Sequence, residues 1–350
     1  MREDAIAGCL VGMAIGDALG LPSEGMTPRR AARLFPDLDR FHFFFGRGMF
    51  SDDTEHACMT GQALLVSAGD PTKFIQSLSW RLRWWLLGLP LSVGRATLKA
   101  IGRLWIGFPT KKSGVFSAGN GPAMRAPILG VCYGDQPERM RELVLRSTLL
   151  THTDPQAFWG SLIIAQAAHL AATSEKTSSA TIHDLIAHLP SEASDFVPLL
   201  ERVGRSVDAQ QTTEAFTEEL GLAQGVTGYI KHTVPVVLHA WLRYPKDYRA
   251  AVHSVIRCGG DTDTTAAFVG ALVGARVGVE GIPVEWRKRM CEWPRDLRWM
   301  NRLARELAAM LQDGKPRPQV PVSVIGLVAR NFLFNLTVIG HVLRRLLPPY

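Results

Sequence analysis

Glycine recurs at every fourth residue in two apolar stretches that lie far apart in the chain. The two series are Gly8, Gly12, Gly16, Gly20 and Gly270, Gly274, Gly278. A spacing of four places each series on one face of an α-helix, where the missing side chains let another backbone come close. Glycine inside a helix costs about 1 kcal/mol relative to alanine, so a packing reason is expected. We therefore expect two central, tightly packed helices that are candidate partners for each other. Membrane pairing uses the same spacing, but Asp17 and the charged flanks argue against it.

The rest of the chain also has helical periodicity, and no series of alternating strand-like segments appears. Helices are expected over residues 3–19, 54–68, 72–88, 92–106, 136–150, 155–173, 180–188, 246–257, 264–277, 284–291 and 296–312. Gly- and Pro-bearing loops separate them. This pattern predicts one all-α domain over residues 1–312. Within it, segment 174–225 is rich in Ser, Thr, Glu and Asp and is expected to be an exposed surface elaboration.

Residues 313–350 form a linker followed by an amphipathic helix. Apolar residues recur in steps of four and three: Ile325, Ala329, Phe332, Leu336, Ile339, Leu343 and Leu346. This seam predicts a helix that docks on the parent domain or on a second subunit, the latter giving an oligomer. A basic helix lying on an anionic membrane surface is the alternative. Arg330, Asn331 and Asn335 interrupt the apolar run, so we expect no transmembrane span.

The amino-acid composition indicates the cellular compartment and the charge of the binding partners. The five cysteines are scattered and form no CxxC pair, which favours buried thiols in a reducing, cytoplasmic compartment. The apolar stretch 5–15 resembles a signal peptide, but Glu3 and Asp4 stand where basic residues should precede it. The formal net charge of +7 favours anionic partners. Nucleic acid is not the expected anionic partner, because the basic aromatic run 80–85 can bury one helix face and leave its arginines at the surface.

Two acidic clusters, 51–54 and 261–265, stand where a loop enters a helix. Ser, Asp and Thr are common N-caps, and capping explains one such cluster by itself. A cap needs one side chain, however, and each of these turns carries two carboxylates beside hydroxyls. Crowded carboxylates raise one another's pKa unless a cation intervenes. Hard divalent ions prefer oxygen ligands, and two ions about 3.5–4 Å apart can share them. The clusters therefore predict a site for two Mg²⁺, with Mn²⁺ as a substitute.

Two further segments are candidates for ligand binding. Residues 117–125 gather glycines around Asn120, and such a loop can present backbone N–H groups to phosphate oxygens, with Arg125 adding charge. A plain turn is the alternative. His152 precedes a helix whose first residue is Pro155, and it can either contact a ligand or serve as a structural hydrogen-bond donor.

The sequence resembles a known family. Residues 12–20 followed by Glu24 are similar to the opening motif of the ADP-ribosylglycohydrolases. The other matching segments follow in that family's order: 51–54, 117–125, His152 and 259–264. The resemblance implies an all-α fold, a single compact orthogonal helical domain, with a binuclear magnesium centre in a cleft. The C-terminal helix has no counterpart in the family that we can place.

Carried over position by position, the resemblance implies three groups of site residues. The metal ligands would be Ser51, Asp52, Asp53, Asp261, Asp263 and Thr264. The substrate-binding residues would be Ser117, Gly119, Asn120, Gly121 and His152. The catalytic residues would be Glu24, Asp53 and Asp263. Ser51 departs from the family, which commonly has Thr at that position, but the hydroxyl is retained and ligation is expected to persist.

The resemblance implies a magnesium-dependent hydrolase that removes ADP-ribose from a modified protein, arginine-linked by preference, or from another ADP-ribosylated target. A water would attack C1″ of the distal ribose, with Glu24 or an aspartate as proton acceptor. Two alternatives stay open: a non-catalytic relative that binds ADP-ribose, and a dinuclear-metal hydrolase of nucleotides or phosphoesters. The presence of every acidic position favours an enzyme.

Overall fold

The computed structural model describes residues 2–91, 93–174 and 179–346 of the chain. Seventeen α-helices and three short 3₁₀ helices make up most of these residues, and no β-strand occurs among them. The predicted all-α fold is confirmed. Apolar side chains from all along the chain join one large buried core.

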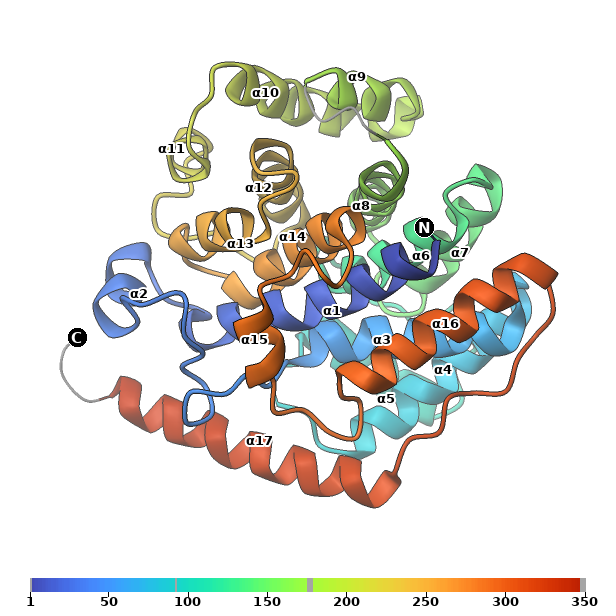
Figure 1. Ribbon diagram of the computed structural model, residues 1–350. Coiled ribbons are helices and arrows are strands. Elements are labelled where there is room, and N and C mark those ends of the chain that lie inside the picture. The colour runs from blue at the N-terminus through green and yellow to red at the C-terminus, as the bar shows by residue number, and fades with distance from the viewer. Residues whose placement is uncertain (1, 92, 175–178, 347–350) are drawn as a thin grey trace.

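Helix α1 (Arg2–Gly20) and helix α14 (Thr262–Val277) run antiparallel through the centre of the domain (Figure 1). They approach backbone to backbone at each of the four glycines of α1. A Cβ added at Gly8 would lie 2.1 Å from the Gly274 carbonyl oxygen, and one at Gly12 would lie 2.2 Å from that of Gly270. No side chain fits at such distances, so the predicted pairing of the two glycine series is confirmed.

The other helices surround this pair. Those that contact it are α3 (Asp52–Ser67), α6 (Ala126–Tyr133), α8 (Pro155–Thr173), α12 (Ile230–Arg243), α13 (Tyr248–Arg257) and α16 (Leu297–Asp313). Farther out lie α2 (Pro28–Leu34), α4 (Pro71–Leu87), α5 (Arg95–Trp105), α7 (Pro137–Leu149), α9 (Ser179–Ala187), α10 (Val197–Asp208), α11 (Thr213–Glu219) and α15 (Val284–Arg289). Helices α2, α6, α10, α11 and α12 were not among the expected elements. Most of these are short or carry proline near the N-terminus or inside, which weakens their periodic signal.

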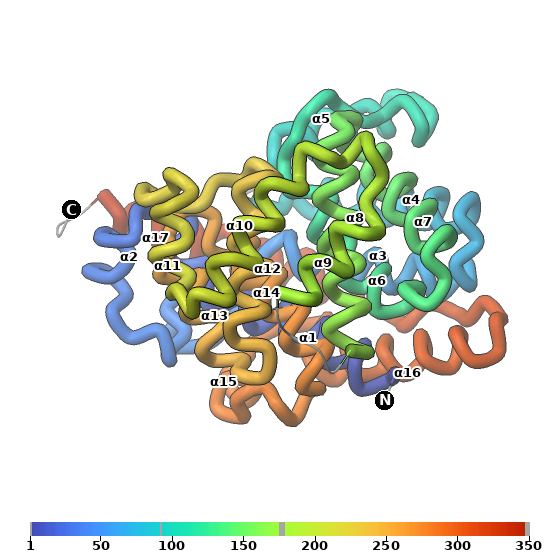
Figure 2. Tube along the Cα trace, turned by 90° about the horizontal axis from the view of Figure 1, so that it is seen from above, coloured from blue at the N-terminus to red at the C-terminus, as the bar shows by residue number. Residues whose placement is uncertain are grey.

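The Ser- and Thr-rich segment expected to be an exposed elaboration contains α9, α10 and α11. These helices form an outer layer above α12, as Figure 2 shows. The layer is not simply exposed, because Phe196, Leu200 and Phe216 are buried in the core. These helices are amphipathic, with polar residues toward solvent and apolar residues toward the core. The polar composition of the segment therefore masked its buried positions.

Helix α17 (Val324–Arg345) lies along one edge of the domain and points toward α2 at its C-terminal end (Figure 1). Its buried residues are Arg330, Asn331 and Phe334. The predicted apolar seam faces outward instead, with Ile325 84% and Phe332 67% exposed. The helix does lie against the parent domain, but it packs through its polar side rather than through the predicted seam, because the buried Glu292 carboxylate binds Arg330 and sets the rotation of the helix.

Two of the described helices, α1 and α17, are long and apolar enough to cross a membrane by length and composition. Helix α1 is entirely buried in the domain, so its apolar character reflects its central position. All five cysteines are free thiols and four of them are buried, as expected.

Candidate active site

The antiparallel pair brings two distant segments together at one end. The C-terminus of α1 leads into the loop that carries Glu24, and the N-terminus of α14 carries the second acidic cluster. The Thr262 hydroxyl donates to the Gly20 carbonyl oxygen at 2.8 Å. The glycine packing therefore has a direct consequence for the site, because it fixes the distance between these two segments.

Backbone hydrogen bonds join further loops to this end of the pair. The Gly260 amide donates to the Met26 carbonyl at 2.7 Å, and the Asp261 amide donates to the Val226 carbonyl at 2.7 Å. Gly260 has a φ of +80°, and a Cβ there would lie 1.9 Å from the Val226 carbonyl oxygen. Only glycine satisfies both constraints. The acidic turn is thus held by backbone geometry rather than by its side chains alone.

A cavity of about 730 Å³ opens where these loops meet. Its lining includes eleven of the twelve predicted site residues: Glu24, Asp52, Asp53, Ser117, Gly119, Asn120, Gly121, His152, Asp261, Asp263 and Thr264. The twelfth, Ser51, does not line the cavity but lies behind it, with its Oγ 3.4 Å from Asp53 Oδ2. The two acidic clusters converge in one cavity, although some 200 residues separate them in the chain.

The two clusters also touch. The Thr264 hydroxyl of the second cluster donates to Asp53 Oδ2 of the first at 3.0 Å. The other oxygen, Asp53 Oδ1, is buried and has no hydrogen-bond partner in the structure. A buried carboxylate oxygen without a partner is costly. A cation at this position would remove that cost.

The electrostatics of the cavity are dominated by carboxylates. Burial raises the pKa of Asp52, Asp53 and Asp263 well above the ordinary range, and the neighbouring carboxylates raise it further. Burial also raises the pKa of Glu24 to about 7, helped by Asp261. Full ionisation of this cluster at neutral pH requires a compensating positive charge.

These residues fit a hard divalent ion in kind. No group of three or more His, Cys, Asp or Glu side chains within the described residues already has metal-binding geometry. Ligation would therefore also draw on hydroxyls, such as that of Thr264, on water and on small movements of the carboxylates. The orphaned oxygen of Asp53 supports an ion at the junction of the clusters. The two-ion centre stays a prediction.

Asp17, to which we assigned no role from the sequence, holds the first acidic cluster in place. It is fully buried in α1. One of its oxygens accepts from the Ser51 amide at 2.8 Å, and the other accepts from the Thr54 hydroxyl at 2.6 Å. It positions the turn before α3 from behind the cavity. The available signal was a lone carboxylate inside an otherwise apolar, glycine-rich helix.

The glycine loop contacts both the second acidic cluster and His152, and phosphate binding by its backbone stays a prediction. The side-chain amide of Asn120 donates to Asp261 Oδ2 at 2.6 Å and so orients a carboxylate of the second cluster. Cβ atoms added at Gly119 and Gly121 would lie 3.2 and 3.1 Å from the His152 ring. The glycines therefore make room for His152. Burial lowers the pKa of His152 to about 3, so its ring is neutral.

Arg125 does not supply charge to the cavity, contrary to expectation. It is fully buried and donates to the hydroxyls of Ser147 and Thr151, each at 2.8 Å. It also lies 3.0 Å from His56 Nδ1. These contacts make it a structural connection between helices. Arg95, at the first turn of α5, lines the cavity instead and was missed because nothing in its sequence surroundings marks it.

The fold and the cavity together define an all-α protein with a carboxylate-lined site assembled at one end of a glycine-packed helix pair. The sequence matches the family described as ADP-ribosylglycohydrolase over residues 1–317. The chain therefore belongs to the ADP-ribosylglycohydrolase family, and the resemblance noted in the sequence is confirmed. Membership of this family supports a hydrolase.

Individual relatives agree. The chain is 27% identical over 315 residues to the ADP-ribosyl-[dinitrogen reductase] glycohydrolase of Rhodospirillum rubrum, covering 88% of this chain and 96% of that protein. It is 27% identical over 207 residues to the ADP-ribosylhydrolase ARH3 of Homo sapiens, covering 51% and 55%. A solved chain titled ADP-ribosylglycohydrolase-related protein complex superposes with a TM-score of 0.60 at 25% identity, covering 89% of this chain and 99% of that one.

Proposed function

We propose that this protein is a magnesium-dependent hydrolase that removes ADP-ribose from a modified protein, with arginine-linked ADP-ribose as the favoured substrate. The observation that carries the proposal is the convergence of Glu24 and both acidic clusters on one cavity. At about 730 Å³, the cavity is within the range of small-molecule sites. The named relative from Rhodospirillum rubrum acts on an ADP-ribosylated protein, which supports a protein target.

The charge of the cavity supports the preference for arginine. Five carboxylates line it: Glu24, Asp52, Asp53, Asp261 and Asp263. A guanidinium-linked ribose brings positive charge to the scissile bond, and so does the oxocarbenium-like transition state of glycoside cleavage. Carboxylates beside the scissile bond attract both the guanidinium group and the oxocarbenium-like transition state. A serine-linked ribose has only the charge of the transition state.

Different residues of the cavity would have different roles in the reaction. Glu24 lines the cavity beside both acidic clusters, where its carboxylate could accept a proton from the attacking water. Asp53 and Asp263 would stabilise positive charge developing at C1″. Asn120 keeps Asp261 oriented through its hydrogen bond. Bound magnesium, held by Asp52, Asp53, Asp261, Asp263 and Thr264 with Ser51 behind them, would supply Lewis acidity and an anchor for the ribose hydroxyls.

The test is a release assay with three substrates: arginine-linked, serine-linked and nucleotide-linked ADP-ribose. Free ADP-ribose is measured by chromatography and mass spectrometry, with magnesium or manganese and with EDTA. We expect fastest release from the arginine-linked substrate, lost in EDTA and restored by either ion. Release of AMP or phosphate would instead identify a phosphoester hydrolase. Tight ADP-ribose binding without any release would identify a non-catalytic relative.

We also propose a cytoplasmic location. Four of the five free thiols are buried, and burial raises the pKa of those at Cys9, Cys58, Cys132 and Cys258, so they are chemically inert. Free thiols without disulfides are typical of a reducing compartment. Fractionation with a tagged full-length protein tests this location.

A further inference from the structure

The side of α17 that faces away from the domain is apolar along the whole helix. Its exposed residues recur in steps of three and four and are each at least half exposed: Ile325, Val328, Phe332, Leu336, Ile339 and Leu343. We call these six residues the α17 stripe. A contiguous exposed apolar surface of this kind is typical of a binding site rather than of an ordinary protein surface.

Polar contacts on the opposite side of α17 prevent the stripe from turning inward. Arg330 Nε donates to Glu292 Oε1 at 2.7 Å, and Asn331 Nδ2 donates to the Gly88 carbonyl at 2.9 Å. Burying the stripe would require the helix to rotate, which would expose this ion pair and break both contacts. The structure therefore presents the stripe outward as a consequence of how the helix is anchored.

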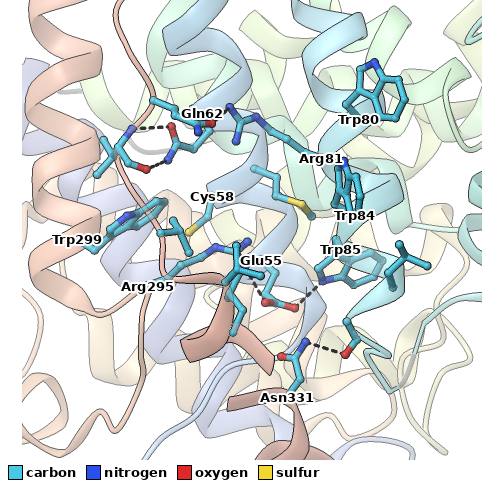
Figure 3. A pocket seen from close by; sticks show the side chains of 18 of the residues that line it. Glu55, Cys58, Gln62, Trp80, Arg81, Trp84, Trp85, Arg295, Trp299 and Asn331 are labelled. Carbon is cyan, nitrogen blue, oxygen red and sulfur yellow. Dashed lines mark hydrogen bonds and ion pairs between the residues drawn. The ribbon is translucent and has the colours of Figure 1, made fainter. Parts of the chain in front are cut away.

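Exposed aromatic side chains border the stripe on both flanks. On one flank, Trp80 and Trp84 line a cavity of about 600 Å³ between α3, α4 and α17 (Figure 3). Val328 of the stripe lines the same cavity. Both tryptophans are more than half exposed. On the other flank, a cavity of about 590 Å³ is lined by Leu336 and by Phe45, whose side chain is 94% exposed. Such aromatic residues are enriched where an apolar phase meets water.

Charge is segregated toward the same elements. The two cavities beside the stripe are lined by four arginines, Arg40, Arg81, Arg295 and Arg344, and by one acidic residue, Glu55. Helix α17 itself contains three arginines and no Asp or Glu. The exposed basic side chains beside the stripe include Arg40 and Arg47. The partner of this region is therefore expected to be anionic.

The acidic side chains of Glu55 and Glu292 do not offset this charge. Glu55 reaches the cavity beside Trp84, but it is buried and ion-paired with Arg295 at 2.7 Å. Glu292 is also buried, and its charge is matched by Arg330 of α17 itself. Neither presents a free negative charge to the surface around the stripe.

We propose that the α17 stripe binds the surface of an anionic lipid bilayer, with the helix lying in the plane of the membrane. An apolar helix face, basic surroundings and exposed tryptophans are the physical features of interfacial membrane helices. Spanning the bilayer is excluded for the anchored helix, because it would pull Arg330 away from Glu292. A second copy docked through the same stripe would set two basic surfaces against each other, which disfavours that partner.

Vesicle flotation of the full-length protein tests the proposal. We expect it to float with vesicles of phosphatidylglycerol and phosphatidylcholine, less so at high salt, and not with phosphatidylcholine alone. Phe332→Glu with Leu336→Glu should weaken partitioning on the order of a hundredfold, because two apolar contacts are lost and negative charge is added. The matched control is Val284→Glu with Ala187→Glu, which changes the charge equally at exposed positions outside the stripe and should bind as the unmodified protein does.

Circular dichroism melts show whether each variant is folded, and only folded variants are compared. Equal flotation of the stripe variant and the control would overturn the proposal. So would equal binding to neutral and anionic vesicles, since it would remove the role of charge. Sedimentation velocity supplies the last comparison. Self-association that disappears in the stripe variant, without vesicle binding, would assign the stripe to a second copy of this chain and overturn the membrane assignment.

Discussion

Arg330 of α17 and Glu292 form an ion pair with 2.7 Å between Nε and Oε1, and both side chains are almost inaccessible to solvent. Arg330 also donates to the Phe50 carbonyl oxygen, and the Phe50 amide donates to Glu292 Oε2 at 3.3 Å. Phe50 immediately precedes Ser51. The C-terminal helix is thus tied, through one buried pair, to the turn that carries the first acidic cluster.

This pair predicts a particular pattern of stability changes. Arg330→Met leaves the Glu292 carboxylate buried and uncompensated, so we expect a loss of about 3–5 kcal/mol in the free energy of unfolding. Glu292→Leu alone should cost a similar amount. The double variant should recover most of the loss, because two apolar side chains replace two charges. Urea denaturation of the four proteins gives the coupling. Losses that simply add would show that the two side chains act independently.

The glycine contacts between α1 and α14 predict a second effect on stability. Gly12→Ala would place a Cβ 2.2 Å from the Gly270 carbonyl oxygen, so the two backbones must separate. We expect a loss of about 3 kcal/mol or more, at the upper end for overpacked cores. Gly102→Ala in α5 is the matched control, since a Cβ there meets nothing within 4 Å. It should stabilise the protein by about 0.5–1 kcal/mol. Similar melting temperatures for the two variants would contradict close backbone packing.

The same contacts show what the sequence could predict. Spacing by four identifies the helix faces and, with two such faces, their pairing; the pairing then brings Glu24 near the second acidic cluster. The pattern in α17 was equally regular, yet its apolar side is exposed. Periodicity identifies the apolar and polar sides of a helix but not which side packs against the domain. In α17, the buried Arg330 determines which side packs.

For the site residues too, the sequence predicted some properties and not others. Their membership in one cavity followed from the family motifs, but their individual roles depended on contacts that no spacing encodes. Arg125 was expected at the ligand and is instead bound by Ser147 and Thr151. Asp17 received no role, although it holds the turn at Ser51. Charged residues inside helices are read correctly only when their partners are known.

The carboxylates of the cavity predict the effect of neutral substitutions. Asp52→Asn and Asp263→Asn should each abolish turnover, by at least a hundredfold in kcat, and weaken magnesium binding. The expected cause is loss of an anionic oxygen ligand while the shape of the side chain is kept. Release assays and calorimetric titration with Mg²⁺ measure the two effects. Asp37→Asn, which removes an exposed charge outside the cavity, is the control. Full activity in both cavity variants would refute the proposed site.

Asn120 predicts a more selective defect. Its side-chain amide donates to Asp261 Oδ2 at 2.6 Å and to the Thr233 hydroxyl at 3.0 Å. Asn120→Asp keeps the size but replaces the donor with another carboxylate, so Asp261 is repelled rather than oriented. We expect kcat to fall at least tenfold while saturating magnesium restores part of the loss. An unchanged magnesium dependence would show that the hydrogen bond does not act through the acidic cluster.

The raised pKa values of the cavity predict how metal-free stability depends on pH. Burial raises the pKa of Asp17 to about 6 and that of Glu24 to about 7, both above their ordinary values. The folded protein therefore holds protons that the unfolded chain has already released. The stability from these groups is fully present below their ordinary pKa and is lost as pH rises through the folded values, between about pH 4 and pH 7. Metal-free protein in EDTA should accordingly become less stable across that window.

Magnesium should reverse this loss, because a divalent ion compensates the same carboxylates that protons otherwise neutralise. The increase in melting temperature on adding excess magnesium should be larger at about pH 8 than at about pH 5, where protons compete for the oxygens. Differential scanning calorimetry at both pH values, with EDTA or with magnesium, measures the difference. Asp52→Asn with Asp53→Asn removes two of the crowded charges, so its stability should depend less on both pH and magnesium. An equal magnesium effect at the two pH values in the unmodified protein would mean that the ion binds outside the acidic cavity.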